Sequence, residues 1–128
     1  MSFENVRFTK DHEWVRIEQG SDVATVGITD FASGELGDVV FVEFPRVGQK
    51  VKAGEPMGTI EAVKTVADLF APVSGVVEEA NTALNDKPSL VSESPFDQGW
   101  FVKMRLSDRA ELDKLMKKSE YDKLVGKD

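Results

Sequence analysis

The stretch from Thr59 to Gly75, TIEAVKTVADLFAPVSG, contains one lysine, Lys64, in a largely apolar run. The charged residues around it are two carboxylates, Glu61 three residues before it and Asp68 four residues after it. A lysine amine that is exposed and neutral can act as a nucleophile and form an amide. Lys64 is therefore the first candidate for chemistry in this chain, although its spacing alone is more typical of an ordinary solvated lysine on a turn.

The rest of the chain offers few reactive side chains. There is no cysteine, which excludes disulfides, thiolate metal sites and cysteine nucleophiles. The single histidine, His12, would have to serve any catalytic triad, and one histidine cannot build a multi-histidine metal site. Strand alternation in KDHEWV places His12 opposite Glu13, where we expect a packed or half-buried ring. Redox or group-transfer chemistry would need reactive atoms from a cofactor.

Composition narrows the class of protein. The 128 residues predict one domain, and 41% hydrophobic with 30% charged residues is typical of a soluble globular chain. No apolar run approaches the ~20 residues of a membrane-spanning helix, and the N-terminal residues resemble neither a signal nor a transit peptide. We therefore expect a cytoplasmic protein. The net charge of −7 argues against nucleic acid or an anionic membrane as partner, while it allows proteins with basic docking faces.

The first two-thirds of the chain predict strands separated by turns. Thr29 is expected to cap a short helix that Gly37 ends. Gly54 is expected in a tight turn between two short strands, and Pro45 stops a strongly apolar strand before it. The predicted strands cover residues 6–18, 21–29, 38–44, 47–51, 56–62 and 99–106.

Residues 107–125 predict a helical C-terminal segment that covers a sheet. Asp108 with Glu111 resembles a capping box at its start. Leu112 and neighbouring apolar residues have helical spacing, and Ser119 is expected to cap a second short helix.

The segment around Lys64 supports two structures. Ala62, Val66, Leu69 and Phe70 recur with helical spacing, which favours a helix ended before Pro72. The alternative is a hairpin in which residues 57–62 and 68–73 are strands joined by a turn at 63–66. The valine and threonine content favours strands, but the residues alone leave both possibilities open.

Collinear motifs then identify a resemblance. IEAVKTVADLFAPVSGVVEEAN resembles the lipoyl-attachment region of the glycine cleavage system H-protein family. KDHEWV, VGITDFA, LGDVVFVEFPRVGQKV and SESPFDQGWFVKM resemble other segments of that family in the same order. The similarity extends from about Phe8 to about Leu124, which is nearly the whole chain.

The resemblance implies a fold and an attachment site. The fold would be mostly β, a barrel-sandwich hybrid of the lipoyl/biotinyl type with short helices. One carrier domain would span residues 1–128, with a lipoyl-like core at about 22–104 and a C-terminal helical segment at 108–125. Lys64 would lie at a hairpin tip and carry lipoate in amide linkage. The residues that would flank this tip are Glu61, Val63 and Thr65.

The resemblance also implies a non-catalytic role. A pyridoxal-phosphate glycine decarboxylase would load an aminomethyl group onto the lipoyl arm, and a tetrahydrofolate-dependent aminomethyltransferase would remove it. Dihydrolipoyl dehydrogenase would reoxidise the arm, and a lipoate-attaching enzyme would install it. We expect the carrier itself to be a monomer. The two lipoyl sulfurs would supply the chemistry that a chain without cysteine lacks.

The loaded arm would end in a cationic amine, which carboxylates can hold. The resemblance suggests a cleft with Glu13 and Asp68 as its acidic residues. Three positions depart from the family pattern. Asp11 and Glu35 stand where serine and histidine are common, so the cleft would be unusually acidic if both line it, and Ala62 replaces a common serine.

Other functions remain open at this level. The departures at Asp11, Glu35 and Ala62 allow an H-like carrier or lipoate donor in another pathway. A biotin carrier is disfavoured because such domains usually place methionine on both sides of the lysine, where this chain has Val63 and Thr65. An unmodified binding domain would leave Lys64 without a cofactor. A true enzyme is least favoured, since no nucleophile–base pair stands out.

Overall fold

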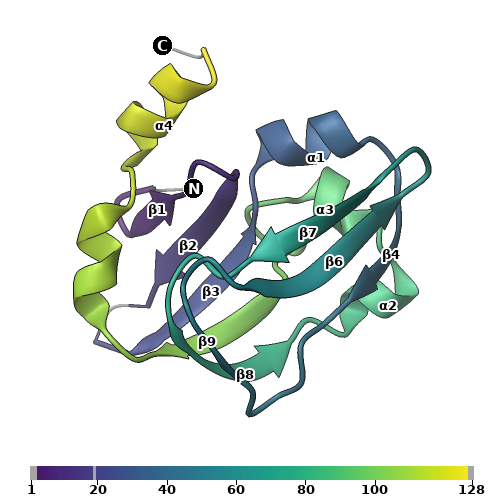
Figure 1. The fold of residues 1–128 in the computed structure, drawn as a ribbon. Helices are drawn as coiled ribbons and strands as arrows, with labels where there is room; N and C mark the ends of the chain where they lie inside the picture. The colour runs from purple at the N-terminus through teal and green to yellow at the C-terminus, as the bar shows by residue number, and fades with distance from the viewer. Residues whose placement is uncertain (1–2, 19, 127–128) are drawn as a thin grey trace.

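A computed structural model describes residues 3–18 and 20–126, which form two antiparallel sheets with short helices around them (Figure 1). The larger sheet has the strand order β1-β2-β3-β9-β8-β5 and the smaller has β4-β6-β7. The strands are β1 (Val6–Phe8), β2 (Glu13–Ile17), β3 (Val23–Ile28), β4 (Val39–Glu43), β5 (Lys50–Val51), β6 (Pro56–Ala62), β7 (Val66–Phe70), β8 (Gly75–Ala80) and β9 (Val102–Leu106). The helices are α1 (Asp30–Leu36), α2 (Ala83–Asp86), α3 (Leu90–Glu93), α4 (Lys118–Leu124) and the 3₁₀ helix η1 (Arg109–Lys114).

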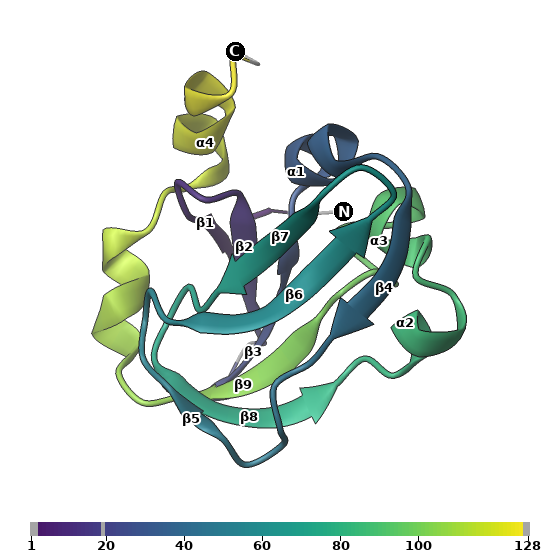
Figure 2. The same ribbon diagram turned by 45° about the vertical axis from the view of Figure 1, so that its right-hand side comes forward.

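The two sheets face each other as layers of a sandwich, as the two views show (Figure 2). Both contribute buried aliphatic and aromatic side chains to one core, because alternate residues of each strand point inward. A second cluster lies under the C-terminal helix and contains Val6, Phe8, Trp14 and Tyr121. The mostly β architecture with short helices agrees with the fold class that we predicted.

Helix α1 begins and ends where the sequence predicts. The Thr29 side chain accepts a hydrogen bond from the Ala32 N–H, which satisfies one of the free donors at the helix start. Gly37 follows the helix with φ of 79°, a conformation that glycine adopts without strain. The predicted turn at Gly54 is also present, with φ of 89°.

The predicted strand over residues 6–18 is wrong in its middle. The chain forms β1 and β2, which pair through a turn at residues 9–12. His12 occupies this turn with φ of 69°, so it does not take part in strand alternation. The Thr9 hydroxyl stabilises the turn by accepting hydrogen bonds from the N–H groups of Asp11 and Glu13. The prediction of a half-buried His12 ring is confirmed. Strand alternation, from which we predicted it, does not apply in this turn.

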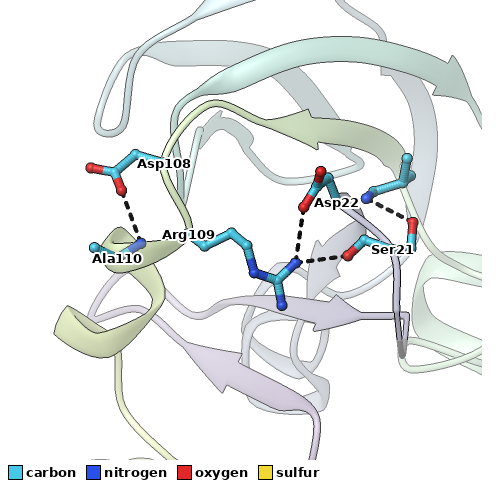
Figure 3. Close-up of polar contacts among 6 residues, drawn as sticks. Ser21, Asp22, Asp108, Arg109 and Ala110 are labelled. Atoms are coloured by element: carbon cyan, nitrogen blue, oxygen red, sulfur yellow. Dashed lines mark hydrogen bonds and ion pairs between the residues drawn. The ribbon is translucent and has the colours of Figure 1, made fainter.

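The C-terminal segment is helical in two short pieces. Asp108 caps η1 by accepting a hydrogen bond from the Ala110 N–H, and Arg109 donates to the Ser21 carbonyl and pairs with Asp22 (Figure 3). The predicted capping box is wrong, because both carboxylate oxygens of Glu111 accept hydrogen bonds from Ser74 instead.

The second piece, α4, has its N-cap at Lys117, two residues before the predicted cap at Ser119. Met116 is extended and pairs with Phe8, so the helical spacing of Leu112 and Met116 does not continue through one helix. The N–H of Lys117 donates to the Glu120 carboxylate at the start of α4, whereas Ser119 lies inside the helix rather than at its cap.

Candidate functional site

The segment around Lys64 forms a hairpin, so the helical alternative is wrong. Strands β6 and β7 pair antiparallel, with Glu61 opposite Val66 at the last step before the tip. The Ala62 N–H donates to the Thr65 carbonyl at 2.8 Å and closes the connection. Lys64 is exposed in this connection. The connection between β6 and β7 extends past α1 (Figure 1).

Two features hold this segment in strands despite its helical spacing. Strand β6 lies between β4 and β7, so pairing on both sides satisfies its backbone groups. The inward side chains of the hairpin, Ile60 and Leu69, are 2% and 1% exposed in the core between the sheets. Tertiary pairing and burial thus override the local pattern.

The residues beside Lys64 are exposed as well. Val63 is 70% exposed, and its N–H donates to the carbonyl of Asp38 at 3.0 Å. Among the described residues, the four ion pairs do not include Lys64, so neither Glu61 nor Asp68 pairs with it. The amine at the tip is therefore open to an incoming enzyme.

A cleft of about 430 Å³ lies beside the hairpin. One wall is formed by the free edge of β7, and the other by α1 with the β1–β2 turn. The lining is apolar with four carboxylates. Its residues are Asp11, His12, Glu13, Ile28, Phe31, Ala32, Glu35, Leu36, Ile60, Thr65, Ala67, Asp68 and Leu69.

The structure brings the two expected acidic residues, Glu13 and Asp68, to this cleft, and it adds Asp11 and Glu35. Three of the carboxylates are exposed, whereas Glu13 is buried. Thr65 is the one tip residue on the lining; Glu61 and Val63 lie outside it. Ala62 is buried below the tip, where a small side chain fits the core.

Glu13 is the most perturbed group in the cleft. Its side chain is 2% exposed; one carboxylate oxygen accepts from the Thr9 hydroxyl at 2.8 Å and the other from the Phe70 N–H at 3.0 Å. Burial raises the pKa of Glu13 from 4.5 to about 7; the two hydrogen bonds oppose that rise and the nearby charge of Asp11 adds to it. Glu13 can therefore gain or lose a proton near neutral pH.

A hydrogen-bonded group that the sequence did not reveal supports the cleft wall. The Tyr121 hydroxyl lies 2.8 Å from Nδ1 of His12 and 2.7 Å from the Thr29 hydroxyl. The His12 ring also packs on Phe31, with ring centroids 4.7 Å apart. One signal was present: Tyr121 is the only tyrosine of the chain and stands alone among polar residues.

Metal-binding clusters and membrane-spanning helices were both sought among the described residues. They contain no group of three or more histidine, aspartate or glutamate side chains arranged to hold a metal ion. No helix within residues 3–18 and 20–126 combines the length and apolarity needed to span a bilayer.

The site fits a covalent lipoyl group by its own chemistry. An exposed amine at the tip offers an attachment point, and the adjacent cleft combines apolar side chains for a hydrocarbon arm with carboxylates for a cationic end. Lys64 does not line the cleft itself, but its neighbour Thr65 does.

Comparison with known proteins points to one family. The family model described as glycine cleavage H-protein matches residues 6–128. The chain is 50% identical over 121 residues to a glycine cleavage system H protein of Geobacillus kaustophilus (94% of each chain), and 52% identical over 123 residues to that of Chlorobaculum parvum (96% of each). A crystal structure of a glycine cleavage system H protein from Mycobacterium marinum is similar with a TM-score of 0.87 at 39% identity, covering 98% of this chain and 99% of the other. This chain belongs to the glycine cleavage H-protein family.

Proposed function

We propose that this protein is the lipoyl carrier of a glycine cleavage system, with lipoate attached to Lys64. The observation that carries the proposal is the position of Lys64, exposed at a hairpin tip beside an apolar cleft that contains four carboxylates. Family membership supports the same role.

Lys64 would contribute the nucleophile for its own modification. Its neutral amine attacks the carbonyl of an activated lipoyl group, the activating group departs, and the amine loses a proton as the amide forms. The amide carries no charge, so the net charge of the chain changes from −7 to −8. The attached group supplies two sulfurs that take up an aminomethyl group and electrons.

The cleft residues would hold a cationic amine at the end of the arm. Asp68 and Glu35 offer exposed carboxylates, and Glu13 offers a buried one whose raised pKa would fall as a cation approaches. The apolar lining would contact the hydrocarbon part of the arm and displace water from it.

Four enzymes would work with this carrier, which catalyses no step alone. They are glycine decarboxylase, the aminomethyltransferase, dihydrolipoyl dehydrogenase and the lipoate-attaching enzyme. We further propose a cytoplasmic monomer without nucleic-acid or membrane partners. Its 128 residues would form one carrier domain, with a core at about 22–104 followed by the segment 108–125.

Intact mass tests the attachment site. The protein purified from lipoate-replete cells should carry one lipoyl group, and Lys64→Ala should carry none. The absence of the added mass in wild-type protein from cells that lipoylate other proteins would refute the proposal, and a biotin-sized addition would replace it with the biotin carrier.

A second candidate keeps the lipoyl arm but serves another pathway, as an H-like carrier or lipoate donor. The observation that favours it is the place of Asp11 and Glu35 on the cleft lining, since both depart from the family pattern and make the cleft more acidic. Glycine–bicarbonate exchange with glycine decarboxylase separates the two: lipoylated protein that supports exchange belongs to glycine cleavage.

A further inference from the structure

Exposed apolar side chains gather beside the tip of the hairpin. Val40 and Phe41 are each 50% exposed, Val66 is 60% exposed and Val63 is 70% exposed. Only two other large hydrophobic residues of the described chain, Val47 and Leu124, are so exposed. We call Val40, Phe41, Val63 and Val66 the outer patch.

Strand pairing assembles the outer patch from distant parts of the sequence. The strands β4, β6 and β7 lie side by side in that order (Figure 2). Phe41 lies opposite Glu61, and Glu61 lies opposite Val66, so these side chains form one row across the three strands. A register shift between Val39 and Phe41 leaves Val40 exposed beside this row.

The tip residue Val63 joins the same surface. Its N–H donates to the carbonyl of Asp38, the residue before β4, and this bond holds the tip against the start of that strand. The outer patch is therefore continuous with the surface that presents Lys64.

The outer patch and the cleft share no residue. Phe41 and Val66 alternate with the inward row of Val42, Ile60 and Ala67. Ile60 and Ala67 of that inward row line the cleft, whereas no residue of the outer patch does. Asp68, two residues after Val66 on β7, also lines the cleft, so the two surfaces meet at this carboxylate.

Acidic residues border the outer patch. Residues 38–43 and 59–70 contain four carboxylates and one basic residue, Lys64. The four are Asp38, Glu43, Glu61 and Asp68, all of them exposed. Glu61 lies within the patch between Phe41 and Val66, and the other three lie around it. A complementary partner surface would therefore combine apolar side chains with lysine and arginine, at its rim and opposite Glu61.

We infer that the outer patch is the docking surface for the lipoate-attaching enzyme. This enzyme must bring its active site onto the Lys64 amine. Before modification that amine extends from the tip only by the length of a lysine side chain, so the enzyme must cover the residues around the tip. Partners that act later are reached by the longer lipoyl-lysine arm and can bind elsewhere. The inference rests on the proposed function, because it assumes that Lys64 is modified.

The test measures lipoylation kinetics with a purified lipoate-attaching enzyme and its activated lipoyl donor. Phe41→Ser, far in sequence from Lys64, should raise KM for the carrier about tenfold with kcat nearly unchanged, since it removes docking contacts and not the nucleophile. Val47→Ser is the matched control, because Val47 is 64% exposed outside the outer patch.

Direct binding provides a readout that does not depend on modification. In a Lys64→Ala background, calorimetry should show about tenfold weaker binding of the enzyme to Phe41→Ser than to the parent. Glu43→Gln should weaken binding at low ionic strength and much less at high salt, while Glu79→Gln on β8 should leave it unchanged. If Phe41→Ser does not fold, the comparison of Glu43→Gln with Glu79→Gln still tests the docking surface.

Each outcome decides one question. Wild-type protein that gains no lipoyl group would refute the proposed function itself. Normal lipoylation of wild type together with an unchanged KM and unchanged affinity for Phe41→Ser and Glu43→Gln would overturn the docking surface alone. Loss of aminomethyl loading by glycine decarboxylase with normal lipoylation would also overturn it, because the outer patch would then serve a different partner.

Discussion

The hydroxyl of Tyr121 lies 2.8 Å from Nδ1 of His12, and this contact joins the C-terminal helix to the turn that lines the cleft. The same hydroxyl contacts the Thr29 cap of α1, the helix on the same wall. Tyr121 is 2% exposed, so both contacts are shielded from water. The cleft wall and α4 therefore form one packed unit.

Tyr121→Phe should lower the free energy of unfolding by about 1–3 kcal/mol, because the buried Thr29 hydroxyl and the half-buried His12 ring lose a partner. The stacking of the ring on Phe8, with centroids 4.7 Å apart, is kept. Urea unfolding measures the loss, and amide chemical shifts of Phe31 and Ala32 should report movement of the cleft wall. Ser119→Ala, on the exposed side of α4, is the control. Equal midpoints for Tyr121→Phe and wild type would show that the hydroxyl contacts add nothing.

Glu13→Gln should flatten the pH dependence of stability. The pKa of Glu13 is 4.5 unfolded and about 7 folded, so the native state binds this proton more tightly. The contribution of this proton to the free energy of unfolding is fully present below pH 4.5 and is lost as pH rises through 7. The change is on the order of 3 kcal/mol. Urea unfolding across this range should show a slope in wild type that Glu13→Gln lacks.

Asp11→Asn provides a graded comparison for the same group. Removing the charge of Asp11 should lower the pKa of Glu13, since that charge helps to raise it. The pH-dependent loss of stability should then move to lower pH without disappearing. Glu18→Gln, an exposed residue outside the cleft, should reproduce the wild-type curve. A wild-type slope retained in Glu13→Gln would assign the titration to another residue.

Gly58→Ala should destabilise the base of the hairpin by about 1–3 kcal/mol. An added Cβ would lie 2.5 Å from the carbonyl oxygen of Glu43 and 2.8 Å from the Phe101 ring, so backbone or core must shift. Gly34→Ala in α1 is the matched control, because its Cβ would meet open space and alanine favours a helix. Thermal unfolding should separate the two; a Gly58→Ala protein as stable as Gly34→Ala would show that β4 and β6 separate easily.

Glu111→Ala should release the C-terminal segment from the sandwich. Its carboxylate accepts from the N–H of Ser74 at 2.7 Å and from the hydroxyl of Ser74 at 2.9 Å. Hydrogen exchange should therefore quicken at Ser74 and along η1, and stability should fall by about 1–3 kcal/mol. The neighbouring Asp113→Ala, which removes an exposed carboxylate, should change neither; unchanged exchange in Glu111→Ala would assign the anchoring to other contacts.

Elements with strong local signals could be predicted from the sequence. Thr29 and Gly37 bound α1 because capping and positive φ are decided by single residues. The hairpin at Lys64 could not be settled from its own residues, since helical spacing and strand composition conflict there. Pairing with β4, which lies some twenty residues earlier, decides the structure.

The candidate site was predictable only in part. The motifs pointed to Lys64, Glu13 and Asp68, and the fold places the two carboxylates on one cleft. The hydrogen bonds of Glu13 to Phe70 and of Tyr121 to His12 connect residues far apart in sequence, so no local sequence pattern predicts them. In the C-terminal segment the cap at Asp108 was predicted correctly, because it is local. The role of Glu111 was not, because its carboxylate bonds to the distant Ser74 rather than to its own helix.

Strand β7 is an edge strand, and such edges can pair with a strand of another molecule. The Glu13 carboxylate already occupies the outward N–H of Phe70, and Asp68 adds a charge two residues earlier. A second copy approaching this edge would meet a backbone N–H that is already hydrogen-bonded and carboxylates that repel its own. The carboxylates that we propose for cargo would thus also oppose the pairing of two copies through the strand that ends beside Lys64.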